Sequence, residues 1–218
     1  LLVVIPGAAG APKRISLSLP GAAAGNSITQ IAISPSGRHL MALNAAAQML
    51  SVFDTADHRR IKLLPTGAAP DQIAFTEKFV YVRNSGEPAI SLAQLSALDD
   101  PGSAPALNIA VGTRAPRSVD REGRFMPFAT LPGEPNGTLI ANPADKVIYF
   151  YMEGMMVPKN SFKTFTAAPL GLLSYDRGLR QRREKGLYEG GVRLSEGGIY
   201  DVVFFLDRPQ LARCFELN

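Results

Sequence analysis

The chain has 218 residues, 46% of them hydrophobic and 19% charged, a composition that excludes a disordered protein. The net charge of +4 is mild, and the densest basic run, 177–185, is interrupted by acid and has no interleaved aromatic residues, so we expect no nucleic-acid partner. A single cysteine, Cys214, excludes an internal disulfide, and no apolar run is long enough for a transmembrane segment.

Short apolar runs separated by Gly and Pro indicate many short strands joined by tight turns. The opening Leu1–Ile5 is interpreted as a strand of a longer parent chain, with the remnant of a trimmed signal peptide as the alternative, and Ile15–Gly21 as the last strand of an early repeat unit. The first complete unit begins with Gln30–Asn44, a strand, a Ser-Pro-Ser-Gly turn and a strand. Strands at Met49–Asp54 and Arg60–Pro65 complete four, which is the size of a propeller blade.

The same unit then recurs, which is the sequence signature of a repeat architecture. Gln72–Phe75 repeats Gln30–Ile33, and the other strands of this second unit are expected at Phe79–Asn84, Ile90–Leu95 and Leu107–Gly112. A third unit is expected to start at Pro135–Gly137, by analogy with Pro70–Gln72. Its segment 138–151 repeats the pattern of strand, Pro-containing turn and strand, so the chain carries two full units and parts of two others.

These units resemble the YVTN family of seven-bladed β-propellers. The family's blade reads as apolar-Ala-Ile-Ser-Pro-Asp-Gly, then a Leu-Tyr-Val-Thr-Asn-like strand, then a Val-Ser-Val-Ile-Asp strand, and residues 31–44 and 50–54 match it closely. Residues 73–84 match less well and 135–151 match in outline. The resemblance implies a propeller, and because a closed ring has four to eight blades, missing blades of the parent chain or a protein partner are expected to complete it.

The C-terminal segment shows a different pattern of strands. They are expected at Phe162–Thr166, Leu170–Asp176, Gly186–Leu194 and Gly198–Leu206, with a hairpin connection at Ser195–Gly198. The phrases Gly-Leu-Tyr-Glu-x-x-Val-x-Leu and Gly-x-Tyr-Asp-Val-x-Phe resemble small immunoglobulin-like periplasmic domains of the FixH and YtkA type. The predicted fold is therefore all-β, with a partial propeller over 1–151 and a small β-sandwich-like domain over 152–218.

Three methionines, Met152, Met155 and Met156, cluster at the predicted domain junction. Thioethers favour Cu(I), so these residues form a candidate copper site. Methionine also fills irregular gaps between packed elements, and this structural interpretation is the preferred one.

The other reactive side chains carry no enzyme signature. His39 is expected at the start of a strand and His58 in a turn, both on the surface, with metal or haem ligation as the alternative. No Cys-x-x-Cys-His motif for covalent haem is present. Cys214 is expected to be a structural thiol despite its basic neighbour. The aspartates, Asp71 and Asp120 among them, are interpreted as turn-capping residues. No phosphate-binding loop or hydrolase motif is present.

The sequence therefore favours a non-catalytic, exported binding or scaffold protein, periplasmic or extracellular, that uses the loop faces of its propeller. The expected loops are Asn44–Gln48, Asn84–Pro88 and the long segment 112–135. The last carries a basic face suited to an acidic partner, formed by Arg114, Arg117, Arg121 and Arg124. No cofactor is expected on this interpretation. The alternatives are a periplasmic redox or copper-handling protein, or an accessory subunit of a quinoprotein or haem-type oxidoreductase.

Overall fold

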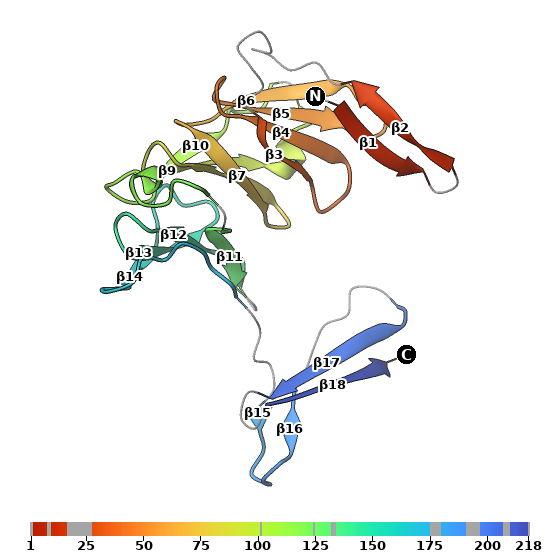
Figure 1. The fold of residues 1–218 in the computed structure, drawn as a ribbon, viewed down its shortest axis with the longest axis vertical. Coiled ribbons are helices and arrows are strands. Elements are labelled where there is room, and N and C mark those ends of the chain that lie inside the picture. The colour runs from red at the N-terminus through yellow and green to blue at the C-terminus, as the bar shows by residue number, and fades with distance from the viewer. Residues whose placement is uncertain are drawn as a thin grey trace. The chain divides into compact units, whose positions relative to one another are not determined.

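The computed structural model describes the backbone of residues 2–7, 10–16, 28–100, 102–123, 125–131, 134–174, 180–190, 197–206 and 210–217. The chain divides into two compact units, residues 1–175 and 176–218, and each is considered by itself. Nearly all regular structure is β-strand, as predicted (Figure 1). Among the described residues the helical elements are two single 3₁₀ turns, Leu95–Ala97 and Pro116–Ser118, and no helix there is long and apolar enough to cross a membrane.

The first unit contains three four-stranded antiparallel sheets, which follow one another along the chain and are called blades 1, 2 and 3. Blade 1 consists of β3 (Ile28–Ile33), β4 (His39–Asn44), β5 (Met49–Asp54) and β6 (Arg60–Pro65). Blade 2 consists of β7 (Pro70–Phe75), β8 (Phe79–Asn84), β9 (Ala89–Gln94) and β10 (Leu107–Ala110). Blade 3 consists of β11 (Phe128–Leu131), β12 (Glu134–Asn142), β13 (Val147–Met152) and β14 (Asn160–Lys163). A two-stranded sheet, β1 (Leu2–Gly7) and β2 (Gly10–Ser16), precedes them.

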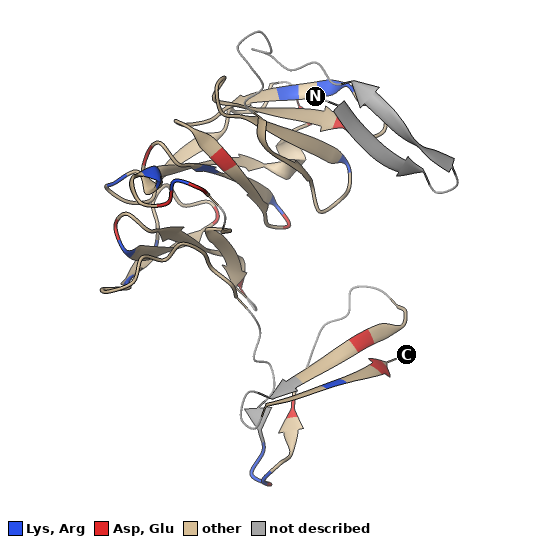
Figure 2. Ribbon diagram, viewed as in Figure 1, with Lys and Arg blue, Asp and Glu red and all other residues tan. Residues whose placement is uncertain are grey.

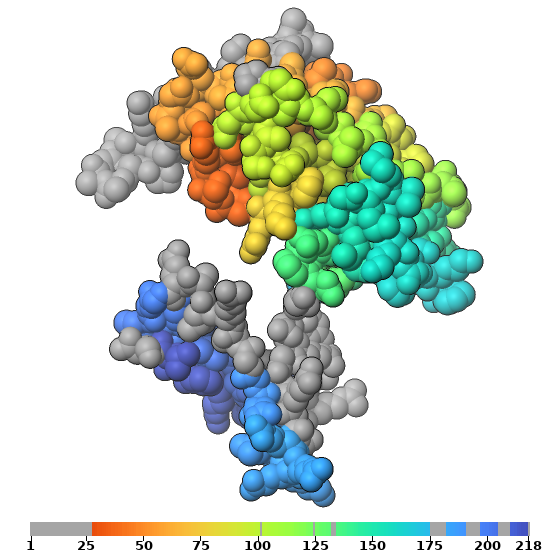
Figure 3. Space-filling model, turned by 180° about the vertical axis from the view of Figure 1, so that it is seen from behind, coloured from red at the N-terminus to blue at the C-terminus, as the bar shows by residue number. Residues whose placement is uncertain are grey.

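Runs of consecutive buried residues, as in β4, β5 and β8, give the blades two covered faces, because successive side chains of a strand point to opposite sides. One face of blade 1, with Met41 and Leu50, packs against Ile73 and Val82 of blade 2. The other face of blade 2 packs against blade 3, where the Tyr81 ring lies 5.8 Å from that of Phe128 and 6.3 Å edge-on to that of Tyr151. The core of this unit therefore lies between blades, which succeed one another from orange to teal in Figure 3.

Repeated polar residues join each blade to the next. In blade 1 the Gln30 side-chain oxygen accepts a hydrogen bond from the Ile73 backbone N–H of blade 2, at 2.5 Å. The matching residue of blade 2, Gln72, donates to the backbone oxygens of Gly123 and Phe125, just before blade 3. The repeat recognised in the sequence is thus a repeat of inter-blade contacts.

A second repeated contact lies at the end of the second strand of a blade. The Asn84 side-chain oxygen of blade 2 accepts from the Gly67 N–H at 3.1 Å, in the segment that arrives from blade 1. In blade 3 Asn142 donates to the Val111 carbonyl at 3.0 Å, in the segment that arrives from blade 2. Each asparagine thereby satisfies backbone groups that the end of an outer strand leaves without a sheet partner.

Blade 3 differs from the sequence prediction in its order of strands. Residues 134–142 form its second strand, because they end at Asn142 as β8 ends at Asn84, and the first strand is β11. The fourth strand, β14, pairs with β13, so the first unit extends to residue 175, whereas the predicted boundary was at 151/152. The described part of the predicted strand at Leu170–Asp176 is not a strand.

The C-terminal unit is also β, as predicted. It contains two hairpins, β15 (Arg180–Gln181) with β16 (Tyr188–Glu189), and β17 (Tyr200–Leu206) with β18 (Leu211–Leu217). Within the described residues, β17 of the predicted strand Gly198–Leu206 pairs with β18, and β16, in the described part of the predicted strand Gly186–Leu194, pairs with β15. Ser195 and Glu196 of the predicted turn lie outside the described residues.

Candidate functional site

The segment 112–127, called the arginine loop, joins the outer strand of blade 2 to the inner strand of blade 3. The equivalent connection between blades 1 and 2, residues 66–69, is much shorter. The arginine loop lies against the other loops at the same end of the blades: the Arg117 N–H donates to the Ser85 carbonyl at 2.9 Å, and Asn142 donates to the Arg114 carbonyl at 3.0 Å. The structure thus brings together two of the three loops that the sequence assigned to one binding face, Asn84–Pro88 and the arginine loop.

A buried ion-pair cluster anchors the arginine loop. The guanidinium of Arg83, 3% exposed, binds both oxygens of Asp71, with Nε–Oδ1 at 2.8 Å and Nη2–Oδ2 at 2.6 Å. Its Nη1 binds Asp120 of the loop at 2.8 Å. Burial alone would lower the pKa of Arg83, but the two carboxylates outweigh it and raise that pKa. Two parallel hydrogen bonds between a guanidinium and a carboxylate fix the relative orientation of the two groups as well as the distance between them.

Gly123 lets the loop approach this cluster closely. Its φ is +56°, and its N–H donates to Asp120 Oδ1 at 3.0 Å. A Cβ at this position would lie 2.9 Å from Arg83 Nη2 and 3.1 Å from Asp71 Oδ2. A side chain here would therefore press on the ion pairs that hold the loop in place.

A second anchor is Asp145, in the turn of blade 3. Its carboxylate accepts from the Thr113 N–H at 2.6 Å, the Thr113 hydroxyl at 2.9 Å and Arg114 Nε at 3.1 Å. Burial opposes ionisation, but the hydrogen bonds from Thr113 and Arg114 prevail, so the pKa of Asp145 lies below its ordinary value. Gly112, with φ +135°, makes room for these contacts, since a Cβ there would lie 2.3 Å from Asp145 Oδ2.

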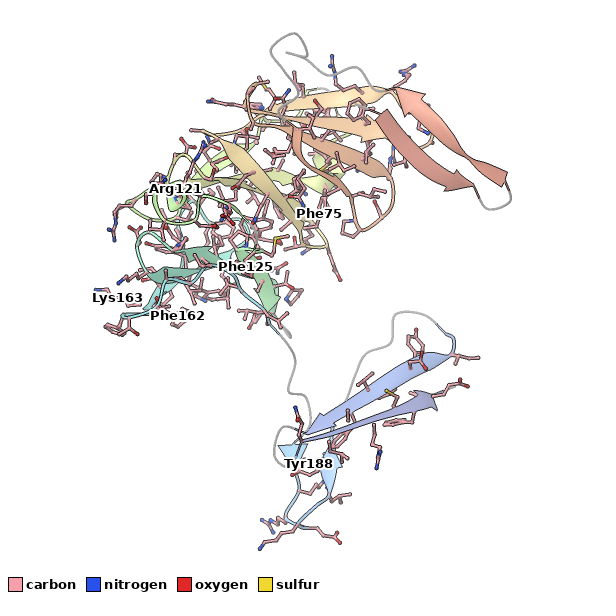
Figure 4. All side chains as sticks on the ribbon, in the orientation of Figure 1. Phe75, Arg121, Phe125, Phe162, Lys163 and Tyr188 are labelled. Atoms are coloured by element: carbon pink, nitrogen blue, oxygen red, sulfur yellow. The ribbon has the colours of Figure 1, made fainter. Side chains whose placement is uncertain are left out.

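The predicted partner-binding arginines lie on this anchored loop. Arg114, Arg117 and Arg121 are exposed, and Arg121 is seen on the loop in Figure 4. Arg114 pairs with Asp145, whereas within the described part of the chain no carboxylate lies at ion-pair distance from Arg117 or Arg121. Arg124 lies outside the described residues. Lys and Arg as well as Asp and Glu occur on the loops beside β10 and β13 (Figure 2).

A pocket of about 550 Å³ lies along the inner strands of the three blades. Its walls are mainly apolar, with Ile73 and Phe75 of β7, Phe128 of β11, and Met126 at the end of the arginine loop. The segment 172–174 also lines it and is tied to the loop by a 2.9 Å hydrogen bond from the Leu172 N–H to the Met126 carbonyl.

Hydroxyl groups form the polar part of this pocket. Thr138 donates to Tyr81 Oη at 3.3 Å, Tyr81 donates to Glu153 Oε1 at 3.3 Å, and the Thr76 hydroxyl donates to the same carboxylate oxygen. Burial, with a further contribution from the Glu153 charge, raises the pKa of Tyr81. The phenol is therefore protonated at neutral pH. A ligand here would meet apolar walls and hydroxyl groups, an arrangement suited to holding a molecule rather than attacking it.

The predicted methionine cluster lies at the end of β13 and in the turn that follows. Met152 is half-buried, Met155 is 38% exposed and Met156 is 65% exposed. The Tyr151 hydroxyl donates to the Met155 carbonyl at 2.8 Å, which fixes the backbone of this turn. In the described ranges no three His, Cys, Asp or Glu side chains gather as a metal site.

The surface position predicted for His39 is wrong. The residue begins β4 and is 4% exposed, because its Nε2 faces Asp99 Oδ1 of blade 2 at 3.2 Å. His58 is half-buried in a turn with φ +62°. Cys214 lies opposite Val203 on β18 and is exposed. The sequence analysis did not identify the Arg83 cluster, because Asp71 and Asp120 look like ordinary turn residues.

No protein-family model matches this chain, and no curated protein matches it in sequence. Solved structures do match its fold. Hydrazine synthase from Kuenenia stuttgartiensis is 18% identical with a TM-score of 0.51, over 67% of this chain and 38% of that one. The β-propeller domain of Cps50 (Swd1) from Myceliophteria thermophila is 18% identical with a TM-score of 0.50, over 75% of this chain and 52% of that one. The chain thus spans about half or less of these structures, and the likeness shows a β-propeller fold.

Proposed function

We propose that this protein is a non-catalytic binding or scaffold protein that takes an acidic partner on its arginine loop. The observation that carries the proposal is the combination of a firmly anchored loop with outward-facing arginines. Arg83 and Asp145 fix the loop at two points, Arg117 is exposed between those anchors, and Arg121 is exposed directly after the second, at Asp120. A loop that is already ordered loses little entropy on binding.

Arginine suits this role because its planar guanidinium binds carboxylates through two parallel hydrogen bonds. Complementary charge also accelerates encounter with a partner, and salt weakens this effect. The binding should therefore be strongest at low ionic strength and directed to carboxylate-rich surfaces.

The finer identity of the two units is part of the proposal. We infer YVTN-like blades from the repeats at 31–54 and 73–84, and an immunoglobulin-like C-terminal domain from the phrases at 186–194 and 198–204. The resemblance of that domain to FixH and YtkA-type domains supports a periplasmic or extracellular location in a bacterium.

The test measures binding of fluorescent poly-L-glutamate by polarisation across a series of salt concentrations. The double substitution Arg117→Ala/Arg121→Ala should weaken binding by about tenfold, and by about thirtyfold at most, at low salt, since each of the two lost charge contacts contributes up to about 1 kcal/mol. The control, Lys159→Ala/Lys163→Ala, removes the same charge from exposed positions on and next to β14 and should change little. Equal losses in the two variants would show that net charge, and not the loop, is responsible.

Copper handling is a second candidate, favoured by the exposure of Met155 and Met156. Titration with Cu(I) against a chromogenic chelator should show a site that Met155→Leu/Met156→Leu removes, because leucine keeps the volume but has no sulfur. Metal content and visible absorption of protein purified from its native source without chelators give the complementary test. Stoichiometric copper would favour this candidate, and a haem or quinone band would favour an oxidoreductase subunit.

A further inference from the structure

Blade 3 has an apolar face that points away from blade 2. Paired residues on neighbouring antiparallel strands share a face, and Leu139 pairs with Phe150 while Ile148 pairs with Phe162. These four side chains, with Ala129 and Ala141 beside them, form what we call the open face of blade 3. Phe162 lies on the side of β14 away from β9 and β10 (Figure 4).

The same positions in blades 1 and 2 are completely covered. Register places Phe162 with Leu64 of blade 1 and Ile109 of blade 2, on the outermost strand of each sheet. Leu64 is 2% exposed and Ile109 is 0% exposed, whereas Phe162 is 51% exposed. At three other matched positions the residues of blades 1 and 2 are also buried, and the residue of blade 3 is half-buried. In the order of blades 1, 2 and 3, these are Met41, Tyr81 and Leu139 on the second strand, and two sets on the third strand: Leu50, Ile90 and Ile148, and Val52, Leu92 and Phe150.

The matching faces of blades 1 and 2 show what covers a face of this kind. Leu50 and Val52 of blade 1 are covered by the aliphatic side chains of blade 2, including Ile73 and Val82. Ile90 of blade 2 is covered in the same way by blade 3. The occupant that this geometry fits is therefore a four-stranded sheet of the same kind, and not an irregular segment or a single helix.

At the opposite end of the row of blades, the inner strand of blade 1 also has exposed apolar residues. Ile31 on the inner strand of blade 1 corresponds to Ile73 and Phe128, which are 2% and 6% exposed, but Ile31 itself is 48% exposed. The next residue on that face, Ile33, is 59% exposed. The inner strand of blade 1 therefore carries apolar positions that the repeat buries wherever a neighbouring blade is present, whereas Ala42 and Phe53 on the same face of its second and third strands are buried.

We propose that the open face of blade 3 is a docking surface for a further propeller blade, carried by the same natural polypeptide beyond these 218 residues. A second copy of this chain is a poorer source. The surface that it would need to offer is the back of its blade 1, and there Ala42 and Phe53 are already 0% and 2% exposed. The three blades found among the described residues fall short of the four or more that a closed ring requires, and the chain spans 52% of a solved propeller domain.

The test compares thiol labelling at position 162 in two proteins, the 218-residue chain and the full natural polypeptide, both carrying Cys214→Ser. Phe162→Cys places a thiol on the open face, and Ser161→Cys places a matched thiol on the same exposed strand but facing the other way. In the 218-residue chain the two thiols should react with maleimide at similar rates. In the full polypeptide, the thiol at 162 should react at least about tenfold more slowly than the one at 161, because only accessible thiolates react.

Equal rates at both positions in the full polypeptide would overturn the proposal. Protection at 162 in the 218-residue chain that increases with protein concentration, with a dimer in light scattering, would assign the face to a second copy and overturn the stated source. Hydrogen exchange on the unsubstituted proteins gives an independent measurement. The β13 and β14 amides should exchange more slowly in the full polypeptide, and unchanged exchange would also overturn the proposal.

Discussion

The two units of this protein have similar strand patterns but very different interiors. In the three-blade unit, side chains such as Leu43, Val52 and Ile109 are 0% exposed, because each blade covers the next. In the C-terminal unit no side chain among those described is buried, and Val203 and Phe215 on the β17–β18 hairpin are 65% and 53% exposed. Alternation is thus sufficient to make a strand, but a core needs a second sheet against the first. Three experiments, from the largest expected effect to the smallest, probe this difference.

The largest effect is expected where the three-blade unit buries charge. Arg83→Ala leaves Asp71 and Asp120 facing each other without their shared cation, which should cost about 3–5 kcal/mol of unfolding free energy. Arg117→Ala, on the same loop but exposed, should change it by less than about 0.5 kcal/mol. Urea unfolding followed by near-ultraviolet circular dichroism measures both. A cost below about 1 kcal/mol for Arg83→Ala would mean that water replaces the cation readily.

The direct comparison of the two units uses one truncation in each. Ile109→Ala removes a fully buried side chain between blades 2 and 3 and should cost about 2–5 kcal/mol. Val203→Ala removes a side chain that is 65% exposed and should cost about 0.5 kcal/mol or less. Thermal unfolding measures both. A large loss for Val203→Ala would show that the hairpin is covered in solution, and the contrast drawn above would no longer hold.

The smallest effect is expected at the rim of the arginine loop. The pKa of Asp145 is lower in the folded chain than in an unfolded one, so its contribution to stability is present above about pH 4 and is lost as the pH falls through the folded pKa. Asp145→Asn should remove that dependence and cost about 1 kcal/mol or less at pH 7, because Arg114 is largely exposed. Melting temperatures of both proteins between about pH 7 and about pH 2 provide the check. Parallel curves would exclude the role assigned to the carboxylate.

The parts of the fold that the sequence could predict are those that repeat locally. Gln30–Ile33 and Gln72–Phe75 revealed two blades because a glutamine at the same position of each blade makes an inter-blade hydrogen bond, which preserves the residue type. The first strand of blade 3 was missed because Phe128–Leu131 follows a long insertion and has no matching Gln-Ile-Ala phrase. In the candidate site, the sequence identified the arginines of the loop, but it did not identify the Arg83 cluster that holds the loop in place. Arg83 meets Asp120 only through tertiary packing, and nothing in the local pattern of either residue indicates the other.

The way the arginine loop is tied has a consequence for how such a protein could diversify. Its first residues are held by Asn142, through the Arg114 carbonyl, and by Asp145, and its later residues by Gln72. The stretch from 115 to 119 has one backbone hydrogen bond to blade 2, from Arg117 to Ser85. Lengthening a loop whose ends are fixed adds little closure entropy. New residues inserted there would alter what the surface recognises while leaving the blades as they are, so specificity and architecture can evolve separately.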